Sequence, residues 1–115
     1  MSTFTALGIR KDYIQGLNEL GIKVPSEIQE KAIPILLKSK IDFVGLAQTG
    51  TGKTAAFGLP ILQQIDANKD EIQALILSPT RELVQQIKKQ LFKYTKYCDD
   101  TIFLEAVYGG EKIDI

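Results

Sequence analysis

Histidine and tryptophan are absent from the 115 residues, and cysteine occurs once, at Cys98. Without histidine, imidazole acid–base catalysis and histidine metal sites are excluded. A lone cysteine cannot form a disulfide within the chain, which is typical of a protein from a reducing compartment. The simplest interpretation of Cys98 is a small apolar residue near the end of a helix.

An excess of charge and long apolar runs are also missing. Fourteen basic and fourteen acidic residues give a net charge of zero, so any contact with a polyanion has to be local. No apolar run approaches the roughly 18 residues that a membrane span requires, and the N-terminal stretch MSTFTALGIRKDY lacks the apolar core of a signal peptide. We expect a soluble, cytoplasmic protein with no membrane partner.

Apolar periodicity predicts helices and short buried strands in alternation. The helices are expected at 10–20, 26–40, 54–65 and 81–98, and the strands at 42–47, 73–78 and 101–108. Pro34 should kink the second helix, and Pro60 should bend or end the third. This order predicts an α/β fold, a parallel sheet with flanking helices.

The expected organisation is one unit, 1–115, with N-terminal helices at 1–40 and a βαβ core at 41–115. Three parallel strands leave an outer strand with unpaired backbone groups. We therefore expect the α/β domain to be incomplete on its C-terminal side.

The stretch AQTGTGKT lies between a predicted strand and a predicted helix, which is the arrangement of a phosphate-binding loop. Glycines let the backbone approach phosphates, and the helix N-terminus offers N–H donors. Lys53 is expected to reach the β- and γ-phosphates, and the Thr54 hydroxyl to bind Mg²⁺, so both are candidate catalytic residues. The predicted nucleotide contacts in the loop are Gln48, Thr49, Gly50, Thr51, Gly52, Lys53 and Thr54. The alternative is a glycine-rich turn with a solvated lysine; Ala47 occupies a slot where the general pattern has glycine.

Four segments together resemble the DEAD-box RNA helicases, in order and spacing, over essentially the whole chain. GIKVPSEIQ, with Phe4 seventeen residues ahead of Gly21, is similar to the Q motif of that family, and AQTGTGKT to its motif I. PTRELV resembles motif Ia, with Val84 in place of the usual alanine, and Gly109 and Gly110 lie where the family has a double glycine.

The resemblance implies ATP as the ligand, with Mg²⁺. Phe4 would stack on the adenine ring and Gln29 would hydrogen-bond its edge, while Ser26, in place of the usual threonine, would brace the loop. Two other interpretations stay open: Ser26 and Gln29 have the spacing of a helix capping box, and Phe4 could be a core aromatic.

For RNA, the resemblance implies backbone contacts through Pro79, Thr80, Arg81, Gly109 and Gly110. Alternatively, Thr80 caps the following helix, Arg81 pairs with an acid, and the two glycines form a turn. The lysines of the last helix are most simply a solvated face; they are Lys88, Lys89, Lys93 and Lys96.

The Asp-Glu-Ala-Asp and Ser-Ala-Thr motifs of the family do not occur in the sequence. The resemblance therefore implies the N-terminal part of the first RecA-like domain of a P-loop ATPase that separates short RNA duplexes together with a second RecA-like domain. We expect the 115 residues alone to bind nucleotide weakly and not to unwind RNA. The alternatives are another P-loop NTPase, such as a DNA helicase or nucleotide switch, and a non-enzymatic module that associates through strand edges.

Overall fold

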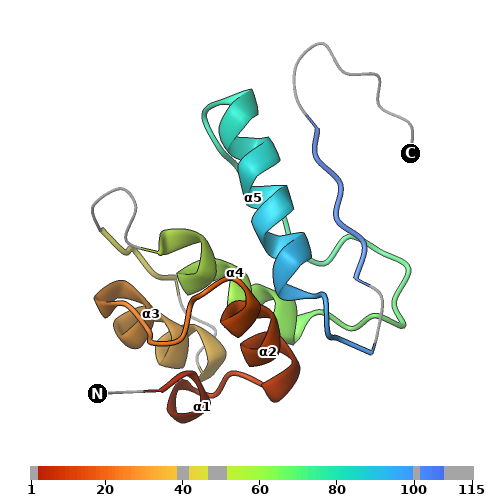
Figure 1. Cartoon of the computed structure of the whole chain (residues 1–115). Helices are drawn as coiled ribbons and strands as arrows, with labels where there is room; N and C mark the ends of the chain where they lie inside the picture. Colours follow the sequence, from red (N-terminus) through yellow and green to blue (C-terminus); the bar gives the residue numbers. More distant parts are fainter. Residues whose placement is uncertain (1–2, 39–41, 47–51, 100–101, 108–115) are drawn as a thin grey trace.

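The computed structural model describes residues 3–38, 42–46, 52–99 and 102–107 (Figure 1). Its helices are α1 (Phe4–Leu7), α2 (Lys11–Glu19), α3 (Glu27–Lys38), α4 (Lys53–Gln64) and α5 (Arg81–Tyr94). Helices α2 to α5 confirm the four predicted helices, although α5 ends four residues before position 98. Helices α3 and α4 continue through Pro34 and Pro60, so neither proline ends its helix.

Helix α1 was not predicted, because four residues are too few to show a helical period. Its boundaries have clear local causes. The Thr3 hydroxyl accepts a hydrogen bond from the Ala6 N–H at 3.1 Å, which caps the N-terminus. Gly8 then ends the helix in the left-handed region, at φ 101°, where a residue with a side chain would be strained.

Helix α4 is the centre of the helical part of the structure. It packs along α3 and also contacts α5, which in turn packs on α2. The core between these helices is one apolar cluster; it consists of Phe4, Leu7, Ile9, Tyr13, Leu17, Ile33, Ala55, Leu59, Leu62, Leu91 and Tyr94. Among the described residues, no helix is long and apolar enough to cross a membrane.

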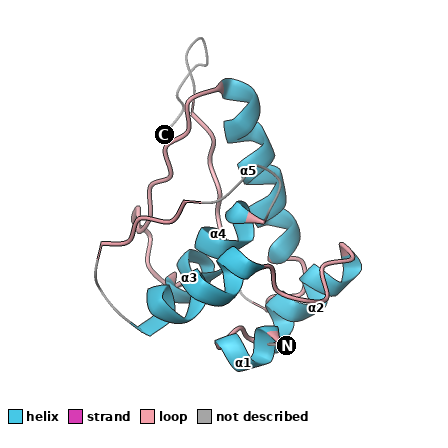
Figure 2. Cartoon of the chain, turned by 90° about the vertical axis from the view of Figure 1, so that its left-hand side faces the viewer, coloured by secondary structure: helices cyan, strands magenta, loops and turns pink. Residues whose placement is uncertain are grey.

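The three predicted strands do not pair with one another within the described residues, and Figure 2 accordingly shows these segments as loops. In the second and third of these segments the apolar alternation is nevertheless real. Ile76, Ile102 and Leu104 pack against the helical core, whereas Leu77 and Phe103 are 85% and 88% exposed. These two segments thus each have one covered and one bare apolar side, whereas every described residue of the first segment, 42–46, is exposed. Apolar alternation predicts a buried strand but does not specify its hydrogen-bonding neighbour, so the sheet stays a prediction.

Gly16 permits the close approach of α2 to the last turn of α5. A Cβ atom at position 16 would lie 3.0 Å from the Tyr94 carbonyl oxygen and 3.1 Å from that of Lys93. Because both are backbone atoms of a packed helix, we expect Gly16→Ala to lower the free energy of unfolding by about 1–3 kcal/mol. Urea unfolding followed by circular dichroism measures this.

Asn18→Ala is the matched control, since Asn18 is an exposed position of the same helix. That substitution should leave stability unchanged or raise it, because alanine favours helix. Equal stability of the two variants would show that the α2–α5 approach is looser than described.

Candidate functional site

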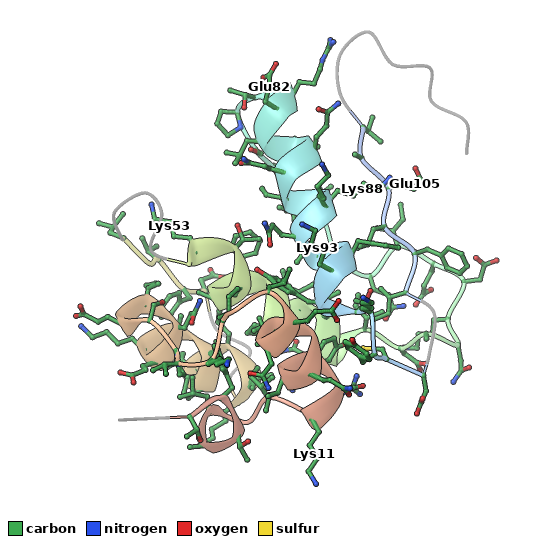
Figure 3. All side chains as sticks on the ribbon, viewed as in Figure 1. Lys11, Lys53, Glu82, Lys88, Lys93 and Glu105 are labelled. Atoms are coloured by element: carbon green, nitrogen blue, oxygen red, sulfur yellow. The ribbon has the colours of Figure 1, made fainter. Side chains whose placement is uncertain are left out.

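The first turn of α4 has the features of an anion site. Gly52 is its N-cap residue, in the left-handed region at φ 84°, and no side chain caps the N–H groups of this turn. Unpaired N–H groups and the helix dipole favour a negative charge here. Lys53 is exposed and Thr54 is half-buried; Figure 3 shows Lys53 projecting from the start of the helix. The other predicted loop contacts, which are Gln48, Thr49, Gly50 and Thr51, lie outside the described residues.

Gln29 connects α3 to this turn. Its side chain is only 3% exposed. The amide nitrogen Nε2 donates to the Gly52 carbonyl at 3.1 Å, and Oε1 accepts from the Ser26 backbone N–H at 2.9 Å. The second bond is the glutamine half of a capping box. Gln29 therefore serves as a cap and as a bridge to the candidate phosphate loop at the same time.

Space at Gly52 is limited by this bridge. A Cβ atom there would lie 2.4 Å from Gln29 Nε2 and 3.2 Å from Ser26 Oγ. The positive φ favours glycine, and a side chain at this position would also displace the Gln29 amide. The Ser26 hydroxyl is buried and has no hydrogen-bond partner among the described residues. The serine half of the capping box is thus not formed. An unpaired buried hydroxyl lowers the free energy of unfolding by about 1–3 kcal/mol. A polar group that hydrogen-bonds to the Ser26 hydroxyl would recover part of this loss.

Phe4 lies in the apolar cluster and is 2% exposed. This position supports the interpretation as a core aromatic. A base could stack on the ring only after its covering moved, so the stacking role of Phe4 stays a prediction.

The start of α5 was expected to contact RNA, and Pro79, Thr80 and Arg81 are all exposed there. The Thr80 hydroxyl accepts from the Leu83 N–H at 3.1 Å, so it caps the helix as the alternative proposed. Gly109 and Gly110 lie outside the described residues.

The lysines of the last helix are exposed, as a solvated face requires. Figure 3 shows Lys88 and Lys93 along α5, well away from Lys53. Lys96 and Tyr97 both hydrogen-bond the Glu19 carboxylate on α2, and these bonds lower the pKa of Glu19. The lysines do not converge on the start of α4.

Tyr13 is a structurally central residue that sequence reasoning missed. Tyr13 and Leu17 are the two fully buried large residues of α2. The Tyr13 hydroxyl donates to the Leu62 carbonyl in α4 at 3.1 Å. The signal was available, because positions 13 and 17 are one helical turn apart.

A cavity of about 120 Å³ lies beside Tyr13 and Cys98 and is also lined by Leu62 and Ile65. These last two residues are at the C-terminal end of α4. The cavity is therefore at the opposite end of the helix from Gly52 and is not part of the candidate phosphate site.

A sequence model of the family described as "DEAD/DEAH box helicase" matches residues 26–115. This match covers most of the chain and includes Gln29 and the whole loop before α4. The chain belongs to the DEAD/DEAH box helicase family, as the resemblance implied.

Curated relatives extend the match to the N-terminal helices. The chain is 44% identical over 113 residues to the ATP-dependent RNA helicase CshA of Listeria monocytogenes, covering 98% of this chain and 21% of that protein. It is 42% identical over 114 residues to the ATP-dependent RNA helicase DeaD of Escherichia coli, covering 99% of this chain and 18% of that protein. The chain thus spans about a fifth of the length of these relatives.

Solved structures share the arrangement of the chain. A DEAD box protein from Methanococcus jannaschii matches 96% of this chain with a TM-score of 0.87 and 31% identity, over 30% of its own length. Dbp5 of Saccharomyces cerevisiae, solved bound to RNA and ADP BeF3, matches 98% with a TM-score of 0.82 and 31% identity, also over 30% of its own length. These similarities support a P-loop NTPase fold.

The Gln29 bridge can be tested by its contribution to stability. Gln29→Ala leaves the Ser26 N–H and the Gly52 carbonyl without their partner, so we expect the free energy of unfolding to fall by about 1–3 kcal/mol. Gln86→Ala, at an exposed position of α5, is the control and should be within about 0.5 kcal/mol of the original chain. Equal urea midpoints for the two variants would argue against the bridge.

Alkaline pH should weaken the fold. Burial raises the pKa of Tyr13 and of Tyr94 above the ordinary 10.0, and the pKa of Cys98 above the ordinary 9.0. The folded state therefore holds these protons more tightly than the unfolded state, and the stabilisation is complete only below the ordinary values. We expect the free energy of unfolding to decrease as the pH rises above about 9.

Urea unfolding at a series of pH values measures this dependence, with Tyr13→Phe combined with Cys98→Ala as the comparison. The double variant should have the shallower decrease. A slope unchanged by both substitutions would mean that other groups cause the alkaline loss.

Proposed function

We propose that this chain forms the adenine- and phosphate-binding part of an ATP-dependent RNA helicase. The observation that carries the proposal is the hydrogen bond between Gln29 and Gly52. It joins the residue expected to recognise adenine to the first turn of the helix expected to bind phosphate. The names of the relatives, which are ATP-dependent RNA helicases, support the same reading.

Gln29 has the chemistry to distinguish adenine from guanine. One N–H of Gln29 Nε2 donates to the Gly52 carbonyl, and one lone pair of Oε1 accepts from the Ser26 N–H. The second N–H of Nε2 and the second lone pair of Oε1 therefore remain as a donor and an acceptor for a base. Adenine offers an acceptor and a donor side by side, at N7 and N6, whereas guanine offers two acceptors, at N7 and O6. Because Gln29 and Phe4 are both almost fully buried, the base has to displace part of their covering, and we expect weak binding.

The start of α4 would hold the phosphates and the metal ion. The N–H groups after Gly52 and the ammonium group of Lys53 would face phosphate oxygens, and the Thr54 hydroxyl would ligate Mg²⁺. Magnesium, when bound, neutralises charge on the phosphate oxygens. The uncapped turn and the tight space at Gly52 fit this role.

For RNA, we propose local backbone contacts by Pro79, Thr80 and Arg81 at the start of α5, and by Gly109 and Gly110. Exposure of the first three residues supports this, as does the solved complex of Dbp5 with RNA. Backbone contacts of this kind position a strand without reading its sequence.

The bare apolar sides of the predicted strands support a larger, RecA-like sheet. Leu75 is 78% exposed, and Leu77 and Phe103 are also bare, although parallel strands are normally covered on both faces. We propose that the further length present in the relatives supplies the missing strands, the acidic catalytic motif and a second RecA-like domain. ATP hydrolysis and duplex separation would require those parts.

A competition experiment tests the nucleotide assignment. Fluorescent ADP with Mg²⁺ is titrated into the chain, and unlabelled ATP and GTP compete. We expect weak binding, displacement by ATP at about tenfold lower concentration than by GTP, and loss of affinity in Lys53→Ala and Gln29→Ala.

Lys93→Ala serves as the charge control for Lys53→Ala, because it removes a lysine from α5, away from the site. If ATP and GTP compete equally well with fluorescent ADP, Gln29 does not recognise adenine. If Lys53→Ala leaves the affinity for nucleotide unchanged, the loop before α4 is not the phosphate-binding site.

A further inference from the structure

Glutamines at the C-terminal end of α4 hold the N-terminal helices. Gln63 Oε1 accepts from the Arg10 N–H at 2.7 Å, and Gln63 Nε2 donates to the Gly8 carbonyl at 3.1 Å. Gln64 Nε2 donates to the Leu36 carbonyl near the end of α3 at 2.9 Å. Gln63 thus binds backbone groups at the end of α1 and the start of α2, and Gln64 holds α3.

This latch, Gln63 and Gln64, lies far from the candidate site. Gln63 follows Lys53 by ten residues, which is about 15 Å along a helix. At the other end of α4, Gln29 from the first turn of α3 holds Gly52. Helix α3 is therefore hydrogen-bonded to α4 near both of its ends.

Two such points fix the relative position of the helices in a way that apolar packing does not. Burial of apolar surface is non-directional, so it permits small sliding and rotation of one helix on another. Hydrogen bonds lose their strength within a few tenths of an ångström and a few tens of degrees. Gln64 at one end and Gln29 at the other therefore define the register of α3 on α4, and with it the distance from Gln29 to Lys53. Gln63 adds to this by holding α1, which packs against α3.

We propose that Gln63 and Gln64 are positioning residues that set base selectivity at the nucleotide site. The inference rests on the proposed function, in which α3 reads the adenine and α4 binds the phosphates. A nucleotide has a fixed span between base and phosphates, so both contacts form only at one register of the helices. A misplacement of about 1 Å far from the reacting groups can cost about a hundredfold in activity.

The test compares the original chain with Gln63→Ala/Gln64→Ala and with the control Gln86→Ala. The first readout needs no ligand: the side-chain amide resonances of Gln29 and their hydrogen exchange, observed by NMR. In the latch variant we expect these resonances to shift and the exchange to become about tenfold faster. The control should reproduce the original spectrum.

The second readout is the competition of three compounds with fluorescent ADP: ATP, GTP and inorganic tripolyphosphate. In the latch variant we expect ATP to weaken about tenfold, so that its advantage over GTP disappears, while tripolyphosphate changes less than about twofold. Equal weakening of all three compounds would mean that the glutamines only stabilise the fold, which would overturn the proposal.

The two readouts separate the proposal from the proposed function. If the original chain shows no preference for ATP, the proposed function fails, and the proposal of base selectivity fails with it. If ATP is preferred but the Gln29 resonances are unchanged in the latch variant, only the positioning role fails. Should the double variant not fold, Gln64→Ala alone removes the bond to α3 and is expected to give both changes in the same direction.

Discussion

The geometry of the candidate site depends on one hydrogen bond, from the Gln29 side chain to the Gly52 carbonyl. It joins two segments that are 23 residues apart and brings the first turn of α3 against the first turn of α4. Position 52 favours glycine because of its φ of 84°, and a Cβ atom there would also displace the Gln29 amide nitrogen, 2.4 Å away. A buried amide that lost this partner would be costly, so the two helix ends are expected to move as one unit.

Helix α4 connects the candidate site to the N-terminal helices. Its start carries Gly52 and Lys53, its middle is buried in the apolar cluster, and its last residues hold α1, α2 and α3 through Gln63, Gln64 and the carbonyl of Leu62. Apolar burial supplies most of the stability. The polar contacts at the two ends supply direction, and they decide how an adenine-binding helix and a phosphate-binding helix are placed relative to each other.

Sequence reasoning succeeded where the cause was local. Helical periods located α2 to α5, and the cap at Thr80, which was the alternative to an RNA contact, is formed. Sequence reasoning missed α1, whose caps are local but whose four residues are too few to show a period. It also missed Tyr13, which is buried and donates its hydroxyl hydrogen to the Leu62 carbonyl. The strands that would pair with the apolar segments around Leu77 and Phe103 could not be predicted, because apolar alternation indicates which face is buried but not which strand lies alongside. Only half of the capping box that the spacing allowed is formed: Gln29 Oε1 accepts from the Ser26 N–H, but the Ser26 hydroxyl has no partner among the described residues.

A net charge of zero gives these 115 residues no general attraction for polyanions. Recognition has to come from a few fixed groups, and the bond from Gln29 to Gly52 fixes two of them. The most direct test is an NMR titration of the ¹⁵N-labelled chain with Mg-ADP and, separately, Mg-GDP. We predict that the Gln29 side-chain amide and the Gly52 N–H shift together along one binding curve with Mg-ADP, and much less with Mg-GDP. A saturating shift of Gly52 with no response at Gln29 would contradict this prediction.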